Sequence, residues 1–278
     1  MNRITGAIGP EDYLEPQCPL ECGPDLQNRA QGIPQRRVLA KLDEYLAKRD
    51  YSAAERHLLY WLEEAKLGRD LQGQLLICNE LVGHYRKNDQ QEKAFSAGKE
   101  AIALLEALNY SDHLSAGTTY VNVATAYSAF GEDGEALPLF ARAKTIYEAN
   151  EAAPDLLGGL YNNMGLCCTA LGKYSEARDL FALALEKMKS VPGGELEQAI
   201  TCLNLADCLD AEQGREACEE QIGDLLKRAR HLLLDTKRNQ DGYYAFVCEK
   251  CAAGFQDYGD RETAEQLNIM AEQIYERA

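Results

Sequence analysis

Residues 161–184 read YNNMGLCCTALGKYSEARDLFALA, and two of their small residues, Gly165 and Ala177, stand twelve positions apart. Small side chains at this spacing are expected one on each helix of a hairpin, where the two helices approach most closely. Between them, Leu171-Gly172 places a glycine where a helix ends easily, because glycine adopts the left-handed conformation at little cost. The stretch therefore predicts two helices joined by a tight turn.

The same spacing returns along most of the chain, and recurrence at a fixed period is typical of stacked repeats. The further pairs, the last two of them looser, are Ala124 with Ala136, Ala206 with Cys218, Ala252 with Ala264, Val82 with Ala94 and Leu42 with Ala54. The second members lie at positions 54, 94, 136, 177, 218 and 264, so successive repeats are 40 to 42 residues apart until a last gap of 46. This predicts six hairpins, with an insertion before the sixth.

Packing and turn residues follow the same period. Three positions after the small residue of each first helix, the chain has Tyr45, Tyr85, Tyr127, Cys168, Leu209 and Phe255. Glycine again follows the first helix at Phe130-Gly131 and Tyr258-Gly259. Together with residues 161–184, this register resembles the tetratricopeptide repeat, and its period resembles the long repeats of kinesin light chains. HEAT or armadillo repeats have a period near 40, but they lack this register of glycine, alanine and aromatic residues.

The resemblance implies an all-α fold, a right-handed α-solenoid of about six tetratricopeptide-like hairpins over residues 35–278, with the first helices lining a concave groove. We expect the hairpin units at about 35–68, 69–109, 112–151, 154–190, 195–235 and 240–278. Residues 1–34 differ, because a continuous helix is excluded by five prolines: Pro10, Pro16, Pro19, Pro24 and Pro34. They are expected to form a Pro/Gly-rich N-terminal arm, either a disordered leader or a segment that packs on the first repeat or in the groove through Ile8 to Leu20.

Charge restricts the kind of partner. The chain is 46% hydrophobic and 27% charged, and its formal net charge of -16 repels both nucleic acid and the anionic membrane surface. No stretch approaches the roughly 20 apolar residues that cross a bilayer. An apolar export signal is also missing at the N-terminus, so we expect a cytoplasmic protein. A neutral to basic protein or peptide is the partner that this charge favours.

The strongest signal for a binding site is a recurring amide. Asn122, Asn163 and Asn204 lie 41 residues apart in successive first helices, and asparagine both donates to and accepts from the backbone of an extended peptide. The resemblance implies such a role, since asparagine at this place contacts ligands in peptide-binding tetratricopeptide proteins. The alternative is that these residues only bond the neighbouring helix. By the same register, further groove residues are Asn79, Arg86, Lys87, Val121, Thr125, Ser128, Asn162, Thr169, Leu203, Asp207 and Asp210.

Metal binding and catalysis have weaker signals. Cys248 and Cys251 occupy core positions of the repeat register, whereas Cys18 and Cys22 do not and form the one cysteine pair that could be tested for zinc. The histidines are dispersed, and none of the phosphate-binding, esterase or zinc-protease motifs occurs. We therefore expect no cofactor and no enzymatic activity.

Three functions are compatible with these patterns. The first is a scaffold that holds a protein or peptide in the groove. The second is a regulatory sensor that resembles the peptide-responsive tetratricopeptide regulators of bacteria. The third is a structural module that associates with itself through Leu58, Trp61 and Leu62 of an end hairpin.

Overall fold

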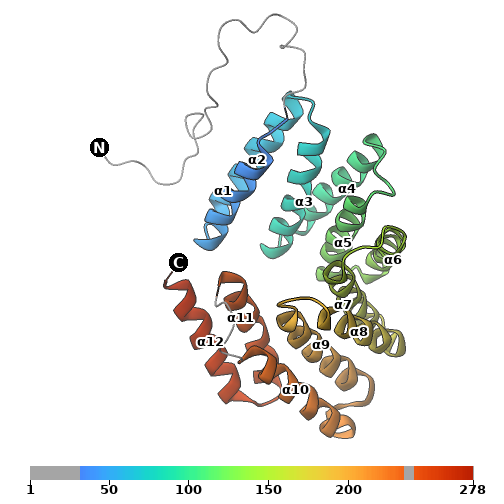
Figure 1. The fold of residues 1–278 in the computed structure, drawn as a ribbon, viewed down its shortest axis with the longest axis vertical. Helices are drawn as coiled ribbons and strands as arrows, with labels where there is room; N and C mark the ends of the chain where they lie inside the picture. The colour runs from blue at the N-terminus through green and yellow to red at the C-terminus, as the bar shows by residue number, and fades with distance from the viewer. Residues whose placement is uncertain (1–31, 235–240, 278) are drawn as a thin grey trace, which may run out of the picture. The chain divides into compact units, whose positions relative to one another are not determined.

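The computed structural model describes residues 32–234 and 241–277, and these residues form twelve α-helices and one short 3-10 helix, with no strand (Figure 1). Each odd-numbered helix packs against the next even-numbered helix. The prediction of an all-helical protein built from consecutive hairpins is confirmed. The helices fall into two compact units that divide between Ser111 and Asp112, and each unit is described by itself.

The first unit contains two hairpins. Its helices are α1 (Gln35–Ala47), α2 (Tyr51–Leu67), α3 (Leu71–Lys87) and α4 (Gln91–Ala107). The start of α3 is fixed by Asp70, whose carboxylate accepts from the backbone N–H of Gly73 at 2.8 Å, as a helix N-cap does. The other oxygen of Asp70 accepts from the N–H of Ile33, and the Ile33 side chain is buried. The end of the proline-rich segment is thus tied to the first unit, while Ile8 to Leu20 lie outside the described residues.

The first unit also corrects one prediction. Leu58 is 0%, Trp61 6% and Leu62 7% exposed, because all three point into the core of the unit. The prediction that these side chains form a surface for self-association is therefore wrong. The helical period explains the error, since the apolar stripe of α2 at these positions packs on the neighbouring helices of its own unit.

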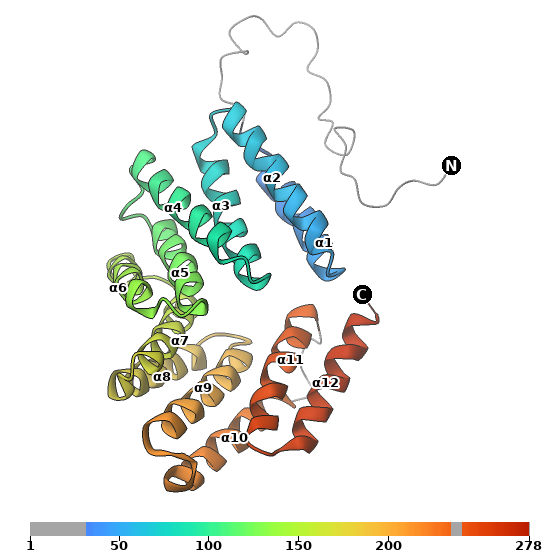
Figure 2. The same cartoon turned by 180° about the vertical axis from the view of Figure 1, so that it is seen from behind.

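The second unit contains four hairpins, with a 3-10 helix at Arg215–Cys218 inside the third (Figure 2). Its helices are α5 (Leu114–Ala129), α6 (Asp133–Ala149), α7 (Pro154–Ala170), α8 (Tyr174–Lys189), α9 (Glu195–Gln213), α10 (Glu219–Leu233), α11 (Gly242–Asp257) and α12 (Arg261–Tyr275). In the α7–α8 hairpin, Gly165 and Ala177 are both buried. A side chain on Gly165 would collide with Phe181, since a Cβ there would lie 2.6 Å from Cε1 of the ring. The glycine therefore makes room for the aromatic ring of the facing helix.

Three of the turns after first helices follow the predicted glycine pattern, whereas α1 and α3 are followed by left-handed Arg49 and Asp89. Gly131, Gly172 and Gly259 have φ of +80°, +72° and +86°, so the predicted left-handed residues are confirmed. The fifth hairpin of the chain departs from the others, because α9 runs on to Gln213 and the 3-10 helix intervenes before α10. Cys218 lies in this 3-10 helix, and it is buried with Ala206 in one small apolar cluster.

Candidate partner-binding surface

The first helices of the second unit line its inner side. α5 contacts α7, α7 contacts α9, and α9 contacts α11, whereas successive second helices have no comparable contacts in this part of the structure. Hairpins that approach more closely on one side curve toward that side. Figure 2 shows α5, α7 and α9 on the inside of this curve, with α6, α8 and α10 outside.

Five side chains on the inner helices are connected by hydrogen bonds. Asn204 of α9 donates to Oδ1 of Asn162 on α7 at 2.9 Å, and Thr201 donates to the same oxygen at 3.1 Å. Asn162 donates in turn to Asn163 at 3.4 Å, and Nδ2 of Asn163 donates to Oγ1 of Thr125 on α5 at 3.2 Å. We call Thr125, Asn162, Asn163 and Asn204 the polar row. It crosses three successive first helices.

The polar row supports both interpretations of the asparagines. Each of its side chains is half-buried, and Asn163 and Asn204 bond the preceding first helix, as the structural alternative requires. An amide has two N–H donors and a carbonyl oxygen with two lone pairs, so the one to three hydrogen bonds that each of these amides forms with other side chains of the inner helices leave part of this capacity open to a ligand. Asn122 occupies the same register on α5 and is also half-buried.

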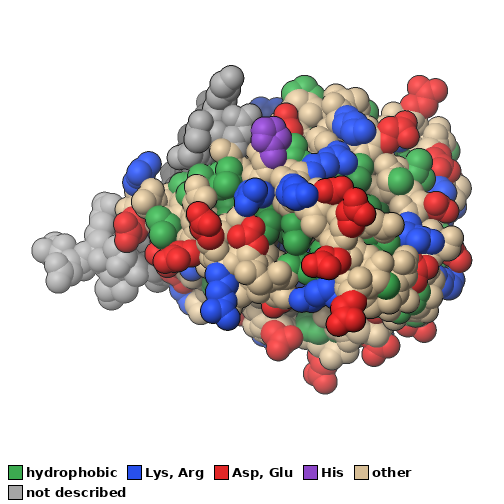
Figure 3. All heavy atoms as spheres, turned by 90° about the horizontal axis from the view of Figure 1, so that it is seen from below, with side chains coloured by type: hydrophobic (Ala, Val, Ile, Leu, Met, Phe, Trp, Pro, Cys, Tyr) green, Lys and Arg blue, Asp and Glu red, His purple; other side chains and the backbone are tan. Residues whose placement is uncertain are grey.

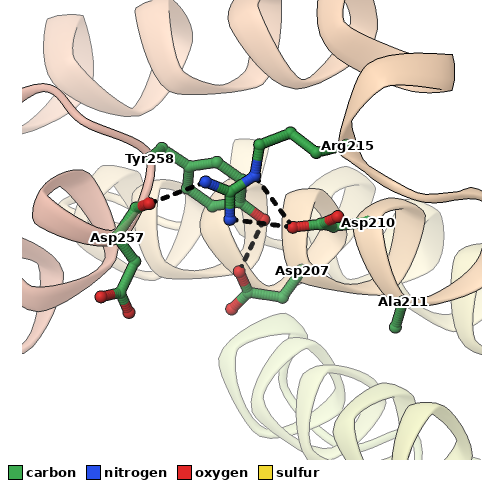
Figure 4. A pocket seen from close by; sticks show the side chains of 6 residues that line it. All are labelled: Asp207, Asp210, Ala211, Arg215, Asp257 and Tyr258. Carbon is green, nitrogen blue, oxygen red and sulfur yellow. Dashed lines mark hydrogen bonds and ion pairs between the residues drawn. The ribbon is translucent and has the colours of Figure 1, made fainter.

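A shallow pocket lies at the end of the inner surface, between α9 and the turn that joins α11 to α12 (Figure 4). Its volume is about 510 Å³, and its lining residues are Asp207, Asp210, Ala211, Arg215, Asp257 and Tyr258. We call it the acidic pocket, because three of these six residues are aspartates. Asp207 is three residues after Asn204 on α9, so the helical period places both on one face.

Arg215 and Tyr258 hold the acidic pocket together. The guanidinium of Arg215 donates to Oδ2 of Asp210 at 3.0 and 3.2 Å and to the backbone carbonyl of Asp257 at 2.8 Å. It also lies 4.5 Å from the centre of the Tyr258 ring, within the range of a cation–π contact. The phenol of Tyr258 donates to Oδ1 of Asp207 at 2.8 Å.

The surroundings of the acidic pocket raise the pKa of two of its side chains, Asp207 and Tyr258. Asp207 is exposed by surface area, yet the protein atoms around its carboxylate desolvate it and raise its pKa, and the charges of Asp210 and Asp257 add to this rise. Donation from Tyr258 and the charge of Arg215 oppose the shift. Desolvation and the nearby carboxylates also raise the pKa of Tyr258, so its phenol stays protonated and continues to donate.

The predicted groove residues of the first unit lie on α3. Nδ2 of Asn79 donates to the carbonyl of Leu75 within the same helix at 3.0 Å. Arg86 is half-buried, and desolvation lowers its pKa. Lys87 is exposed at the last residue of α3, where a cation also interacts favourably with the helix dipole. These residues and the polar row belong to different units, so the predicted site divides into an α3 part and a part on α5, α7 and α9.

The described part of the chain contains no group of three side chains suited to hold a metal ion, and Cys18 and Cys22 lie outside it. Eight cysteines are described and all are buried; burial raises the pKa of Cys78, Cys167 and Cys251 to about 12.

Of the helices described, none is long and apolar enough to span a membrane. On the face drawn in Figure 3, acidic and basic side chains are interspersed.

The repeat register predicted the residues of the polar row together with Asp207 and Asp210, but it did not indicate Thr201, Arg215, Asp257 or the phenol of Tyr258 as parts of the surface. Thr201 is at a buried helix position and gives no signal of its own. Arg215 belongs to the 3-10 helix, which interrupts the repeat register that identified the other residues. The one available signal was Gly214, whose φ of +81° ends α9 and begins the irregular segment.

Comparisons with known proteins agree with this fold. No protein-family model matches the chain. A segment of 116 residues, 42% of the chain, is 28% identical to Protein KINESIN LIGHT CHAIN-RELATED 2 of Arabidopsis thaliana, and the match spans 17% of that protein. A Podosopora anserina protein described as a kinesin light chain with nearly identical TPR-like repeats is 19% identical, with a TM-score of 0.51 over 72% of this chain and 94% of that chain.

A variant of the Podosopora anserina protein matches with a TM-score of 0.52 at the same identity and coverage. At 19% identity this likeness establishes the fold. The register of small, aromatic and glycine residues agrees with it, as does the sequence match to a kinesin light chain-related protein. The chain therefore has the fold of a tetratricopeptide-like repeat protein, and part of its sequence is similar to a kinesin light chain-related protein.

Proposed function

We propose that residues 112–277 form a non-catalytic, cytoplasmic binding module that holds an extended, neutral to basic segment of another protein on the inner face of α5, α7 and α9. The observation that carries this proposal is the polar row, because its hydrogen bonds hold amides from successive repeats in a line. Side chains that are already fixed lose little conformational entropy when a ligand binds. Amides in a line suit a peptide backbone, which offers donors and acceptors at regular intervals.

Charge supports the choice of partner. The net charge of -16 and the acidic pocket beside the polar row attract a basic segment and repel an acidic one. The described cysteines are all buried, and burial raises the pKa of Cys167 and Cys208, so these thiols are poor nucleophiles. We therefore infer a scaffold and not an enzyme.

The test begins with a random peptide library selected on the wild-type chain. The affinity of each selected peptide is then measured by fluorescence polarisation for wild type and for the triple variant Asn122→Ala, Asn163→Ala and Asn204→Ala. We expect the triple variant to bind about fivefold more weakly or worse, since two or three lost hydrogen bonds of about 0.5–1.5 kcal/mol each correspond to at least that factor.

The matched control is Asn150→Ala. Asn150 donates from its amide to the carbonyls of Asp112 and Ile146 at the end of α6, outside the polar row. It should leave peptide affinity unchanged, and circular dichroism should show that all variants remain helical. Equal affinity of wild type and the folded triple variant would remove the asparagines from the mechanism.

A further inference from the structure

The acidic pocket already holds a guanidinium, that of Arg215. The group is stacked on the Tyr258 ring, with its centre 4.5 Å from the ring centroid, and it donates to a carboxylate on one side and a backbone carbonyl on the other. An aromatic face combined with a carboxylate is the arrangement that proteins use to bind arginine, since the planar cation both stacks and donates. The pocket is thus built for a guanidinium.

The charge of one guanidinium does not neutralise the three carboxylates of the acidic pocket. Of the three carboxylates, only Asp210 forms an ion pair with Arg215, at 3.0 Å. Asp207 accepts from the neutral phenol of Tyr258, and in Figure 4 the carboxylate of Asp257 points away from the guanidinium. Three negative charges and one positive charge leave the pocket with a charge of about -2. The remaining volume of about 510 Å³ is open to solvent and within the range of ligand sites.

Arg215 is also placed where it can move without disturbing a long helix. It lies in the four-residue 3-10 helix that follows Gly214, and its side chain is 51% exposed. An ion pair this exposed to solvent contributes little to stability, so it can be exchanged for a contact with a partner.

We propose that the acidic pocket receives an arginine side chain of the bound partner between Asp207 and Asp257, and that Arg215 is an internal occupant that competes with it. The proposal rests on the proposed function, to which it adds the chemistry of the partner. The partner arginine would gain two carboxylates and the Tyr258 ring, while repulsion from Arg215 weakens its binding until Arg215 leaves the ring. Removal of the Arg215 charge should therefore strengthen binding.

The probe is an acetylated and amidated peptide, Gly-Gly-Arg-Gly-Gly, and its control is the same peptide with citrulline, which has the shape of arginine without the charge. Binding to the full chain is followed by the backbone amide signals of Ala211, Asp257 and Tyr258 in a nitrogen–proton correlation spectrum. We expect the arginine peptide to shift these signals and the citrulline peptide to leave them in place. Arg215→Gln should bind the arginine peptide about tenfold more tightly, because one like charge a few ångströms away is removed.

The double variant Asp207→Asn and Asp257→Asn should bind the arginine peptide at least about fivefold more weakly, since both uncompensated charges are lost. Asp224→Asn is the matched control, because Asp224 is an exposed aspartate that pairs with Lys227 on α10 and not with the pocket. Equal shifts with arginine and citrulline, or weaker binding by Arg215→Gln, would overturn the proposal. Stronger shifts with a lysine peptide than with the arginine peptide would also contradict it.

The two proposals can fail separately. Library peptides that depend on Asn163 and Asn204 but ignore the Asp207 and Asp257 variants would refute the arginine pocket and leave the proposed function intact. An arginine probe that binds as expected, on a chain from which no library peptide is selected, would refute the proposed function and leave the pocket intact.

Discussion

Gly165 and Gly159 lie in the same helix, α7, but face different surroundings. A Cβ on Gly165 would meet Phe181 at 2.6 to 2.8 Å, whereas a Cβ on Gly159 would meet nothing within 4 Å. We expect Gly165→Ala to lower the free energy of unfolding by about 1–3 kcal/mol, the usual cost of overpacking a core. Gly159→Ala should raise it by about 0.5–1 kcal/mol, since alanine favours the helix. Urea unfolding followed by circular dichroism measures both changes. If the two substitutions changed the free energy of unfolding in the same direction, the described packing would be contradicted.

Glu151 adopts a left-handed backbone conformation although it is not glycine. Its φ is +48° two residues after α6 ends at Ala149, the same distance at which Gly131 follows α5 and Gly172 follows α7. A left-handed conformation costs a residue with a Cβ about 1–2 kcal/mol. Glu151→Gly should therefore raise the free energy of unfolding by about 1 kcal/mol, and Gly131→Ala should lower it by a similar amount. Thermal unfolding of each variant and of wild type measures the two changes in stability, which should have opposite signs.

The histidines of α2 and α3 make the first unit sensitive to acid. His57 is buried and bonded to the carbonyl of Val38 at 2.9 Å, and His84 is buried with Nδ1 unpaired in the described structure. Desolvation lowers the pKa of both below the ordinary value of 6.5. The folded state then binds fewer protons than the unfolded state. The neutral histidines therefore contribute stability above pH 6.5, and this contribution is lost as the pH falls toward their lowered folded-state pKa values.

We therefore expect His57→Asn to make unfolding of the first unit less dependent on pH between 7.5 and 5.5. The readout is the fluorescence of Trp61, the one tryptophan of the chain, which is buried in this unit. The raised pKa of Glu80 acts in the opposite direction and is the same in both proteins, so their difference isolates the histidine. A variant with the pH dependence of wild type would contradict the assignment.

Elements were more predictable than the interactions between them. The spacing of Gly165 and Ala177 and the glycines at 131, 172 and 259 predicted hairpins and turns, because helical period and glycine conformation are local properties. The irregular end of α9 was not predictable in this way. Nothing local in Arg215 indicates that it bonds Asp257, which follows 42 residues later. The acidic pocket depends on that long-range contact, whereas the polar row was predictable because it keeps the repeat register.

At the scale of the whole molecule, the buried cysteines provide a test of the packing. Seven of the eight described cysteines lie in the second unit and one, Cys78, in the first. A buried thiol with a raised pKa is rarely the reactive thiolate. We expect a maleimide to modify none of the eight in the native chain at pH 7 and all of them in urea, as measured by peptide mass spectrometry. Rapid native labelling of Cys167 or Cys251 would contradict the described core.

The central claim is that the inner helices of the second unit, and not the outer ones, hold a partner. The most direct measurement is the chemical-shift footprint of a library-selected peptide on the isotope-labelled chain. We expect the perturbed signals to concentrate on α5, α7 and α9, with Asn163 and Asn204 among them, while the signals of α6, α8 and α10 remain unchanged. A footprint centred on α6, α8 and α10 would contradict it.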